Sequence, residues 1–262
     1  MSLPDRIPYW TRGEPRTNFG DYLTELLYDG LFRGRTDWID GEIHLIGSVI
    51  SDLYVEAARA AGHRRIVYWG CGLRHPHDLA PANRKAAKFC GVRGLLTRAV
   101  LGLPRTTPIG DPGLLLPRFY RPAPAPDFAG KALCIRHVGT SMSDAALLKQ
   151  TGADVVLSPW ISPDRAACHR LIDAIAAADF VLTASLHGAV VAHAYGVPFA
   201  YLNDRKIDVP FKWADFSSSI GFECDFVSTV KEGRKHHARN ARQRPALLTL
   251  DALVAAAPLK PA

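Results

Sequence analysis

The chain has 262 residues, of which 48% are hydrophobic and 22% are charged, and these proportions are typical of a globular protein with a large core. No stretch approaches the length of a transmembrane helix, and the polar start MSLPDRIPYWTRGEP lacks the apolar core of a signal peptide. The five cysteines are scattered, and no CxxC or HxxxH pair is present. We therefore expect a cytoplasmic protein with reduced thiols, no disulfide framework and no bound metal.

The net charge of +7 favours an anionic partner, which is a phosphorylated substrate, an acidic membrane surface or a nucleic acid. Many of the basic residues lie in KEGRKHHARNARQR, residues 231–244. Such a run is typical of a solvated helix face, and peripheral docking to anionic lipid at the inner face of the membrane is the alternative. Because no recognised binding motif accompanies the charge, we expect no nucleic acid.

From residue 43 onward, short apolar runs alternate with helical patterns. In the first half the strand-like runs are 43–50, 64–70 and 87–92, and the helix-like runs are 52–62 and 95–103. In the second half the strand-like runs are 131–138, 154–160, 180–184 and 198–202, and the helix-like runs are 144–152, 165–179 and 188–196. This alternation predicts βαβ units, a parallel sheet and an α/β fold.

A proline-rich stretch, PRFYRPAPAPDFAG at 117–130, interrupts the alternation. Its prolines do not fit the interior of a central strand or helix, so we interpret it as a linker. The sequence therefore predicts two Rossmann-like domains that face each other across a cleft. The expected bounds are 1–117 and 130–245, with the linker at 118–129 and a C-terminal tail at 246–262.

One histidine stands out in TASLHGAVVAHAYGVPF, residues 183–199. His187 follows a buried strand and begins a helix of small residues, which is the ligand-binding edge of a parallel sheet. Ser185 and Gly188 belong to the same turn, whose free N–H groups suit a phosphate, and a glycine lets a ligand approach the backbone. The alternative is a structural histidine, which is how we interpret His193.

Four motifs then appear in order: TNFGDYLTELL at 17–27, GVRGLLTRAVLGL at 91–103, IGDPGLLLP at 109–117 and ASLHGAVVAHAYGVP at 184–198. Together they resemble the polysaccharide pyruvyltransferase family, especially its exopolysaccharide-type members, from residue 17 to about 221. The resemblance implies a two-domain fold similar to the GT-B glycosyltransferases. It also implies transfer of pyruvate from phosphoenolpyruvate to a sugar, which forms a cyclic ketal and releases phosphate without a cofactor. The chain departs from the pattern at Ser185, where many members have arginine, and at Gly94, where they have aspartate.

The resemblance and the residue chemistry together give candidate roles. His187 would act as the acid–base residue and contact phosphate, because an imidazole can give or take a proton near neutral pH. Asp21 would orient or deprotonate the acceptor hydroxyl, although Asn18, Gly20 and Asp21 also look like the cap of a helix. The expected substrate-binding residues are Arg93, Thr97, Asn18, Gly20, Ser185, Gly188, Arg136, His137, Lys212 and Trp213.

Several of these residues have an ordinary structural alternative. Arg93 would clamp a phosphate or carboxylate, or else form a surface ion pair. Trp213 would stack on a sugar, or else pack in the core. Asp111 in GDPG is typical of a turn, with a role at the domain junction as the alternative.

The expected partners are phosphoenolpyruvate and a lipid-linked or nucleotide-linked saccharide acceptor. Two other functions compete with this one. The first is a GT-B-type glycosyltransferase that uses a nucleotide sugar, because a fold does not fix a function. The second is a partner in polysaccharide assembly that has lost catalysis.

Overall fold

The computed structural model describes residues 3–205, 207–240 and 247–260. Its first sheet has three parallel strands in the order β2-β3-β4, which are Glu42–His44, Ile66–Cys71 and Ala87–Val92. The helices that follow these strands are α2 (Asp52–Ala60), α3 (Pro81–Ala86) and α4 (Leu95–Val100). All residues of β3 are buried, which explains why the central strand is a continuous apolar run.

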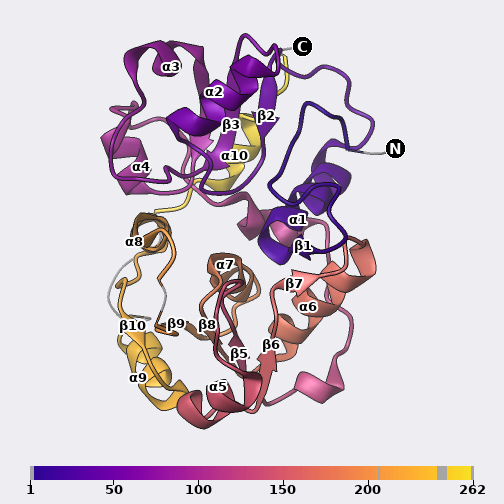
Figure 1. Ribbon diagram of the computed structural model, residues 1–262, viewed down its shortest axis with the longest axis vertical. Coiled ribbons are helices and arrows are strands. Elements are labelled where there is room, and N and C mark those ends of the chain that lie inside the picture. The colour runs from indigo at the N-terminus through magenta and orange to yellow at the C-terminus, as the bar shows by residue number, and fades with distance from the viewer. Residues whose placement is uncertain (1–2, 206, 241–246, 261–262) are drawn as a thin grey trace.

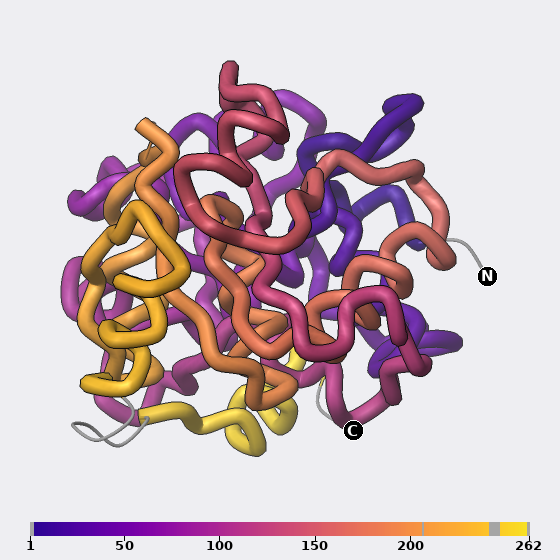
Figure 2. The backbone as a smooth tube through the Cα atoms, turned by 90° about the horizontal axis from the view of Figure 1, so that it is seen from below, coloured from indigo at the N-terminus to yellow at the C-terminus, as the bar shows by residue number. Residues whose placement is uncertain are grey.

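The second sheet has five parallel strands in the order β10-β9-β8-β5-β6. These strands are Phe226–Val227, Phe199–Leu202, Phe180–Thr183, Ala132–Ile135 and Val155–Leu157. The accompanying helices are α5 (Asp144–Thr151), α6 (Arg165–Ala177), α7 (Leu186–Ala194), α8 (Pro210–Ile220) and α9 (Val230–Asn240). The two sheets lie one above the other along the long axis (Figure 1), and the view from below has the second half in front of the first (Figure 2). The predicted α/β class with parallel sheets is thus confirmed.

Segments near both ends of the chain pack against the sheet that the opposite half of the sequence forms. Strand β1 (Thr17–Asn18) pairs antiparallel with β7 (Trp160–Ile161), and α1 (Phe19–Leu27) packs in the core around the second sheet. Helix α10 (Leu250–Ala255) lies on the first sheet, where the Trp69 indole donates to the Leu253 carbonyl oxygen over 2.7 Å (Figure 1). The 3₁₀ turn Pro126–Phe128 lies in the predicted linker, and a second one, Pro112–Arg118, ends where that linker begins.

Two predicted segments differ in extent from the structure. The strand expected at 43–50 is only three residues long, because the chain turns at Gly47, where φ is +111°. The basic run 231–244 is helical up to Asn240, while residues 241–244 and the predicted boundary at 245 lie outside the described residues. Within the described part of the chain, no helix combines the length and apolar character of a membrane span.

Candidate active site

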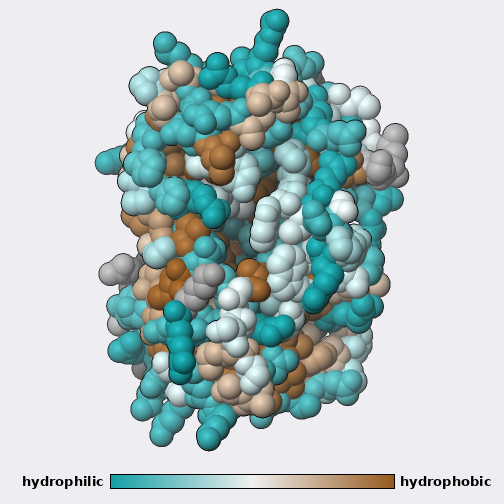
Figure 3. All heavy atoms as spheres, in the orientation of Figure 1, coloured by the Kyte–Doolittle hydropathy of each residue, from teal (hydrophilic) through white to brown (hydrophobic). Residues whose placement is uncertain are grey.

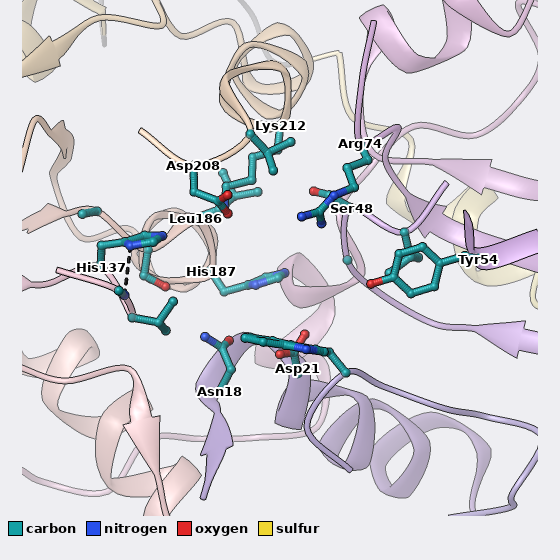
Figure 4. A pocket seen from close by; sticks show the side chains of 18 of the residues that line it. Asn18, Asp21, Ser48, Tyr54, Arg74, His137, Leu186, His187, Asp208 and Lys212 are labelled. Atoms are coloured by element: carbon teal, nitrogen blue, oxygen red, sulfur yellow. Dashed lines mark hydrogen bonds and ion pairs between the residues drawn. The ribbon is translucent and has the colours of Figure 1, made fainter. Parts of the chain in front are cut away.

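A cavity of about 800 Å³ opens where the carboxyl ends of the two sheets face each other. Seen as spheres, this face of the molecule is hollowed near its middle, between the two halves (Figure 3). Loops after β2 and β3, the first turns of α1 and α7, and the segment before α8 all contribute to its walls. The polar and charged lining residues are Asn18, Asp21, Ser48, Tyr54, Arg74, His137, Ser185, His187, Asp208 and Lys212 (Figure 4).

His187 occupies the position that the sequence predicts, in the first turn of α7 just after β8. The Thr183 hydroxyl shapes the turn, because its oxygen accepts from the Ser185 N–H over 3.0 Å and its O–H donates to the Ser185 carbonyl oxygen over 2.9 Å. A Cβ at Gly188 would lie 2.6 Å from that hydroxyl oxygen, so the turn requires glycine there. The imidazole rests against Gly20, where a Cβ would come within 2.0 Å of Nδ1. Gly20 thus gives the imidazole its place in the cavity wall.

A buried carboxylate faces the imidazole. His187 Nε2 lies 3.9 Å from Asp111 Oδ2, which is too far for a hydrogen bond, and each atom is buried without a hydrogen-bond partner in the structure. The other carboxylate oxygen, Asp111 Oδ1, accepts from the Gly113 N–H over 3.0 Å. Burial, with the charges of Arg93 and Lys212, lowers the pKa of His187 to about 3. This lowered pKa favours the neutral imidazole. Burial also raises the pKa of Asp111 to about 6.

Asp21 lines the same cavity from the first turn of α1, which Asn18 caps by accepting from the Gly20 N–H over 2.9 Å. The predicted helix cap is therefore present, and it places Asp21 beside the cavity. Burial raises the pKa of Asp21 to about 7, although the charge of Lys212 opposes this shift. Asp21 and His187 therefore have pKa values displaced in opposite directions, an arrangement that typically marks an acid and a base of one site.

Two cations reach the cavity from opposite halves of the molecule (Figure 4). Lys212 comes from α8, and its Nζ donates to Asp208 over 2.9 Å. Arg74 follows β3 and makes no side-chain hydrogen bond or ion pair with another described residue. Burial lowers the pKa of Lys212, and the positive charges of Arg93 and Arg74 contribute to the same shift. Two cations that line one cavity favour an anionic ligand there.

Arg93 lies behind the cavity wall instead of in it. Its guanidinium is fully buried, with Nε 3.3 Å from Asp215 Oδ2 and Nη1 donating over 2.7 Å to Ser48 Oγ, which does line the cavity. Thr97 is also buried and donates to Asp215 through its N–H and its hydroxyl, over 2.8 and 2.7 Å. The surface ion pair considered for Arg93 is wrong, because its partner is buried. Direct contact of Arg93 or Thr97 with a substrate stays a prediction.

The other predicted residues divide between the cavity and the rest of the molecule. His137 and Ser185 line the cavity. Arg136 does not, and its Nη1 lies 3.5 Å from Asp144 on the surface. Trp213 is only 2% exposed and packs against Tyr201 and Phe226, so its ring has no open face for a sugar. The core alternative therefore describes Trp213.

Sequence reasoning missed Arg74, Tyr54 and the pairing of Asp111 with His187. Arg74 comes shortly after the buried strand β3, and a cation in that position is itself a signal for a ligand edge. Val209, immediately before α8, adopts φ +46°, a left-handed conformation that is strained for a β-branched residue. This strained turn places Asp208 and Lys212 in the cavity, and the sequence contains no local sign of it.

Comparison with known proteins shows the family of the chain. The chain is 26% identical over 217 residues to the succinoglycan biosynthesis protein ExoV of Rhizobium meliloti (strain 1021), and the match covers 82% of this chain and 65% of that protein. It thus spans slightly less than two thirds of the relative's length. No solved structure matches the chain. Residues 39–205 match the family model described as polysaccharide pyruvyl transferase. The chain therefore belongs to the polysaccharide pyruvyl transferase family.

Proposed function

We propose that the protein transfers pyruvate from phosphoenolpyruvate to a sugar of a polysaccharide precursor, with the reaction taking place in the cavity around His187. The observation that carries this proposal is the meeting of four groups in one cavity. These are a neutral imidazole, a carboxyl group of raised pKa, and two cations from opposite halves. An anionic donor needs the cations, and ketal formation needs one group that gives a proton and one that takes a proton.

The displaced pKa values suggest how the proton transfers are divided. Protonated Asp21 gives its proton to the methylene carbon of phosphoenolpyruvate, while His187 takes the proton of the attacking acceptor hydroxyl. A C–O bond then forms at the central carbon. Attack by a second hydroxyl, whose proton passes to the Asp21 carboxylate, forms the second C–O bond. Phosphate leaves with the proton that His187 holds, so both groups return to their starting states. The bound anion itself favours the charged imidazolium, so donor binding raises the pKa of His187 from about 3.

Arg74 and Lys212 are the residues that we infer to hold the donor. Lys212 is one of the substrate-binding residues that the sequence predicts. Arg74 supplies a second cation in the cavity that Ser185 also lines, where many members of the family have arginine at the Ser185 position. The backbone N–H groups at the start of α7 add to the anion site. The two sheets, whose carboxyl ends face one cavity, also support a GT-B-like arrangement of two Rossmann-like units as part of the proposal.

The function is tested by mixing the protein with phosphoenolpyruvate and lipid-linked or nucleotide-linked oligosaccharides, and by measuring phosphate release. We expect release that depends on the acceptor, and a product whose mass increases by one ketal-linked pyruvate. A matched reaction with nucleotide sugars and no phosphoenolpyruvate examines the glycosyltransferase alternative. Sugar transfer there, without phosphate release in the first reaction, would contradict the proposal. Inactivity in both reactions, with phosphoenolpyruvate still bound, would favour the assembly partner.

Replacing Arg74 by alanine should weaken binding of phosphoenolpyruvate by about 10- to 100-fold, since a hydrogen bond to a charged group contributes about 1.5–3 kcal/mol. Titration calorimetry without an acceptor measures this change. Arg33→Ala is the matched control, because Arg33 is exposed and its guanidinium pairs with Asp29 away from the cavity. Equal affinity of the Arg74 variant and the wild type would exclude Arg74 from the donor site.

The pH dependence of kcat/KM distinguishes the two roles of Asp21. If Asp21 gives a proton, kcat/KM falls as the pH rises through about 7, because the carboxyl group ionises there. If Asp21 instead deprotonates the acceptor, kcat/KM rises over the same range. We expect the fall, and we expect Asp21→Asn to lower the rate and to remove this step from the profile. A step that persists in Asp21→Asn belongs to the substrate or to another residue.

A further inference from the structure

Two indole rings stand together in the wall of the cavity. The ring centroids of Trp10 and Trp160 are 5.9 Å apart, with 46° between the ring planes, and both residues line the cavity. Trp10 is 64% exposed, and Leu53, which lines the same cavity, is 70% exposed. These are the two highest exposures among the large apolar side chains of the described residues. Exposed apolar side chains that gather at one cavity indicate a binding surface, whereas single scattered ones do not.

Hydrogen bonds hold the Trp160 ring and the backbone segment that carries Trp10 in place. Trp160 lies in β7 directly opposite Asn18 of β1, and its indole N–H donates to the Val138 carbonyl oxygen over 3.1 Å. The segment that carries Trp10 is tied to β1, because Thr11 Oγ1 accepts from the Asn18 N–H over 3.2 Å and lies 2.6 Å from Thr17 Oγ1. The Arg12 guanidinium also donates to the carbonyl oxygens of Leu3, Pro4 and Ile7. A ring and a backbone segment that are fixed before a ligand arrives lose little conformational entropy on binding.

We propose that Trp10 and Trp160 form the subsite for a hexose ring of the saccharide acceptor, an assignment that rests on the proposed function. A pyranose has an apolar C–H face, which an indole covers, and hydroxyl groups at its edge, which need polar partners. Asn18, Asp21 and Tyr54 line the same cavity and can supply those partners. Asn18 is paired with Trp160 and begins the turn that carries Asp21, so a sugar on the indoles lies beside the proton-transfer groups.

The size and polarity of the cavity favour a saccharide over other occupants. About 800 Å³ is in the range of pockets that hold ligands of drug size, which is more than a three-carbon donor fills. A prenyl or acyl chain in the same place would offer no polar partner to the Asn18 side-chain NH₂ group or to the Asp21 carboxyl group. The sugar-stacking role considered for Trp213 is therefore assigned to Trp10 and Trp160.

The test measures saccharide binding without phosphoenolpyruvate, with the neutral β-linked glucose tetramer cellotetraose as the probe. Saturation-transfer NMR on the full chain should show magnetisation passing from the protein to the C–H protons of the sugar. Trp10→Ala should raise the Kd for cellotetraose by about tenfold, which corresponds to about 1.4 kcal/mol, and Trp10→Phe should raise it less. Leu96→Ala is the control, because Leu96 is exposed but does not line the cavity.

Several results would overturn the subsite. The first is that the wild type binds no saccharide, and the second is that Trp10→Ala has an unchanged Kd for cellotetraose. The third is that Trp10→Ala loses only its binding to vesicles of anionic phospholipid. A weakened affinity of Trp10→Ala for phosphoenolpyruvate would assign the rings to the donor. Saccharide binding and phosphoenolpyruvate binding are measured separately. A negative result for the saccharide subsite therefore leaves the measurements of donor binding and of phosphate release unaffected.

Discussion

Replacing His187 by alanine is expected to lower kcat by about 10² to 10⁴-fold, or roughly 3 to 5 kcal/mol in the activation barrier, while the protein still folds. The change removes the proton acceptor from the cavity, but Gly188, the Thr183 hydroxyl and the start of α7 remain. Stability should change little, since the imidazole Nε2 has no hydrogen-bond partner in the structure. Steady-state phosphate release and thermal unfolding of the same preparations measure the two effects.

Two further variants define the role of His187. His187→Gln keeps a polar side chain of similar size but cannot shuttle a proton, so we expect it to be nearly as inactive as the alanine variant. His193→Gln is the control on the same helix, where the ring packs edge-on against Phe199 and Phe216 and should affect stability more than rate. If His187→Gln retains nearly full activity, His187 only binds substrate, and the proton-accepting role passes to Asp21 or His137.

The part of the site that lies on one contiguous segment could be predicted from the sequence. The run from Phe180 to Thr183 is buried and β-branched, the small residues after it form a helix, and Gly196 closes that helix, so local patterns alone place His187. The same reasoning finds β3, which is a continuous apolar run. Periodicity, glycine and proline are local signals, and here no tertiary contact overrides them.

The contacts between distant segments could not be predicted in this way. Asp111 looks like a turn residue in GDPG, and it does cap a turn, but nothing nearby in the sequence shows that its second oxygen faces His187. Helix α1 belongs to the first half of the sequence, yet it packs in the core of the second sheet. Side-chain pairs across such long separations depend on the tertiary arrangement, which a single sequence does not reveal.

Arg93 shows the same limit for a charged residue. The sequence places it correctly at the carboxyl end of β4, where a guanidinium suits an anionic substrate. Its counter-ion, Asp215, lies 122 residues later, in α8, and both side chains are buried. Sequence reasoning therefore found a residue at the centre of the molecule, but the structure gives it a buried partner behind the cavity.

This burial leads to the largest stability effect that we expect in the protein. Arg93→Met should lower the free energy of unfolding by about 3 to 5 kcal/mol, because it leaves the Asp215 carboxylate buried without its cation. That loss is a large share of the 5 to 15 kcal/mol that stabilises a typical domain. Urea unfolding followed by circular dichroism measures it. Arg136→Ala is the matched control, since its ion pair with Asp144 is partly exposed and should contribute at most about 1 kcal/mol.

A second substitution separates structural loss from loss of a substrate contact. Asp215→Asn removes the charge of the partner but keeps an oxygen that can accept from the Thr97 N–H, so the double variant Arg93→Met/Asp215→Asn should recover part of the stability that Arg93→Met loses. Burial already raises the pKa of Asp215, which means that its ionised form depends on the Arg93 charge. If Arg93→Met instead unfolds at the same urea concentration as the wild type and loses only its affinity for phosphoenolpyruvate, Arg93 reaches the donor directly. The side chain would then have to leave Asp215 when the substrate binds.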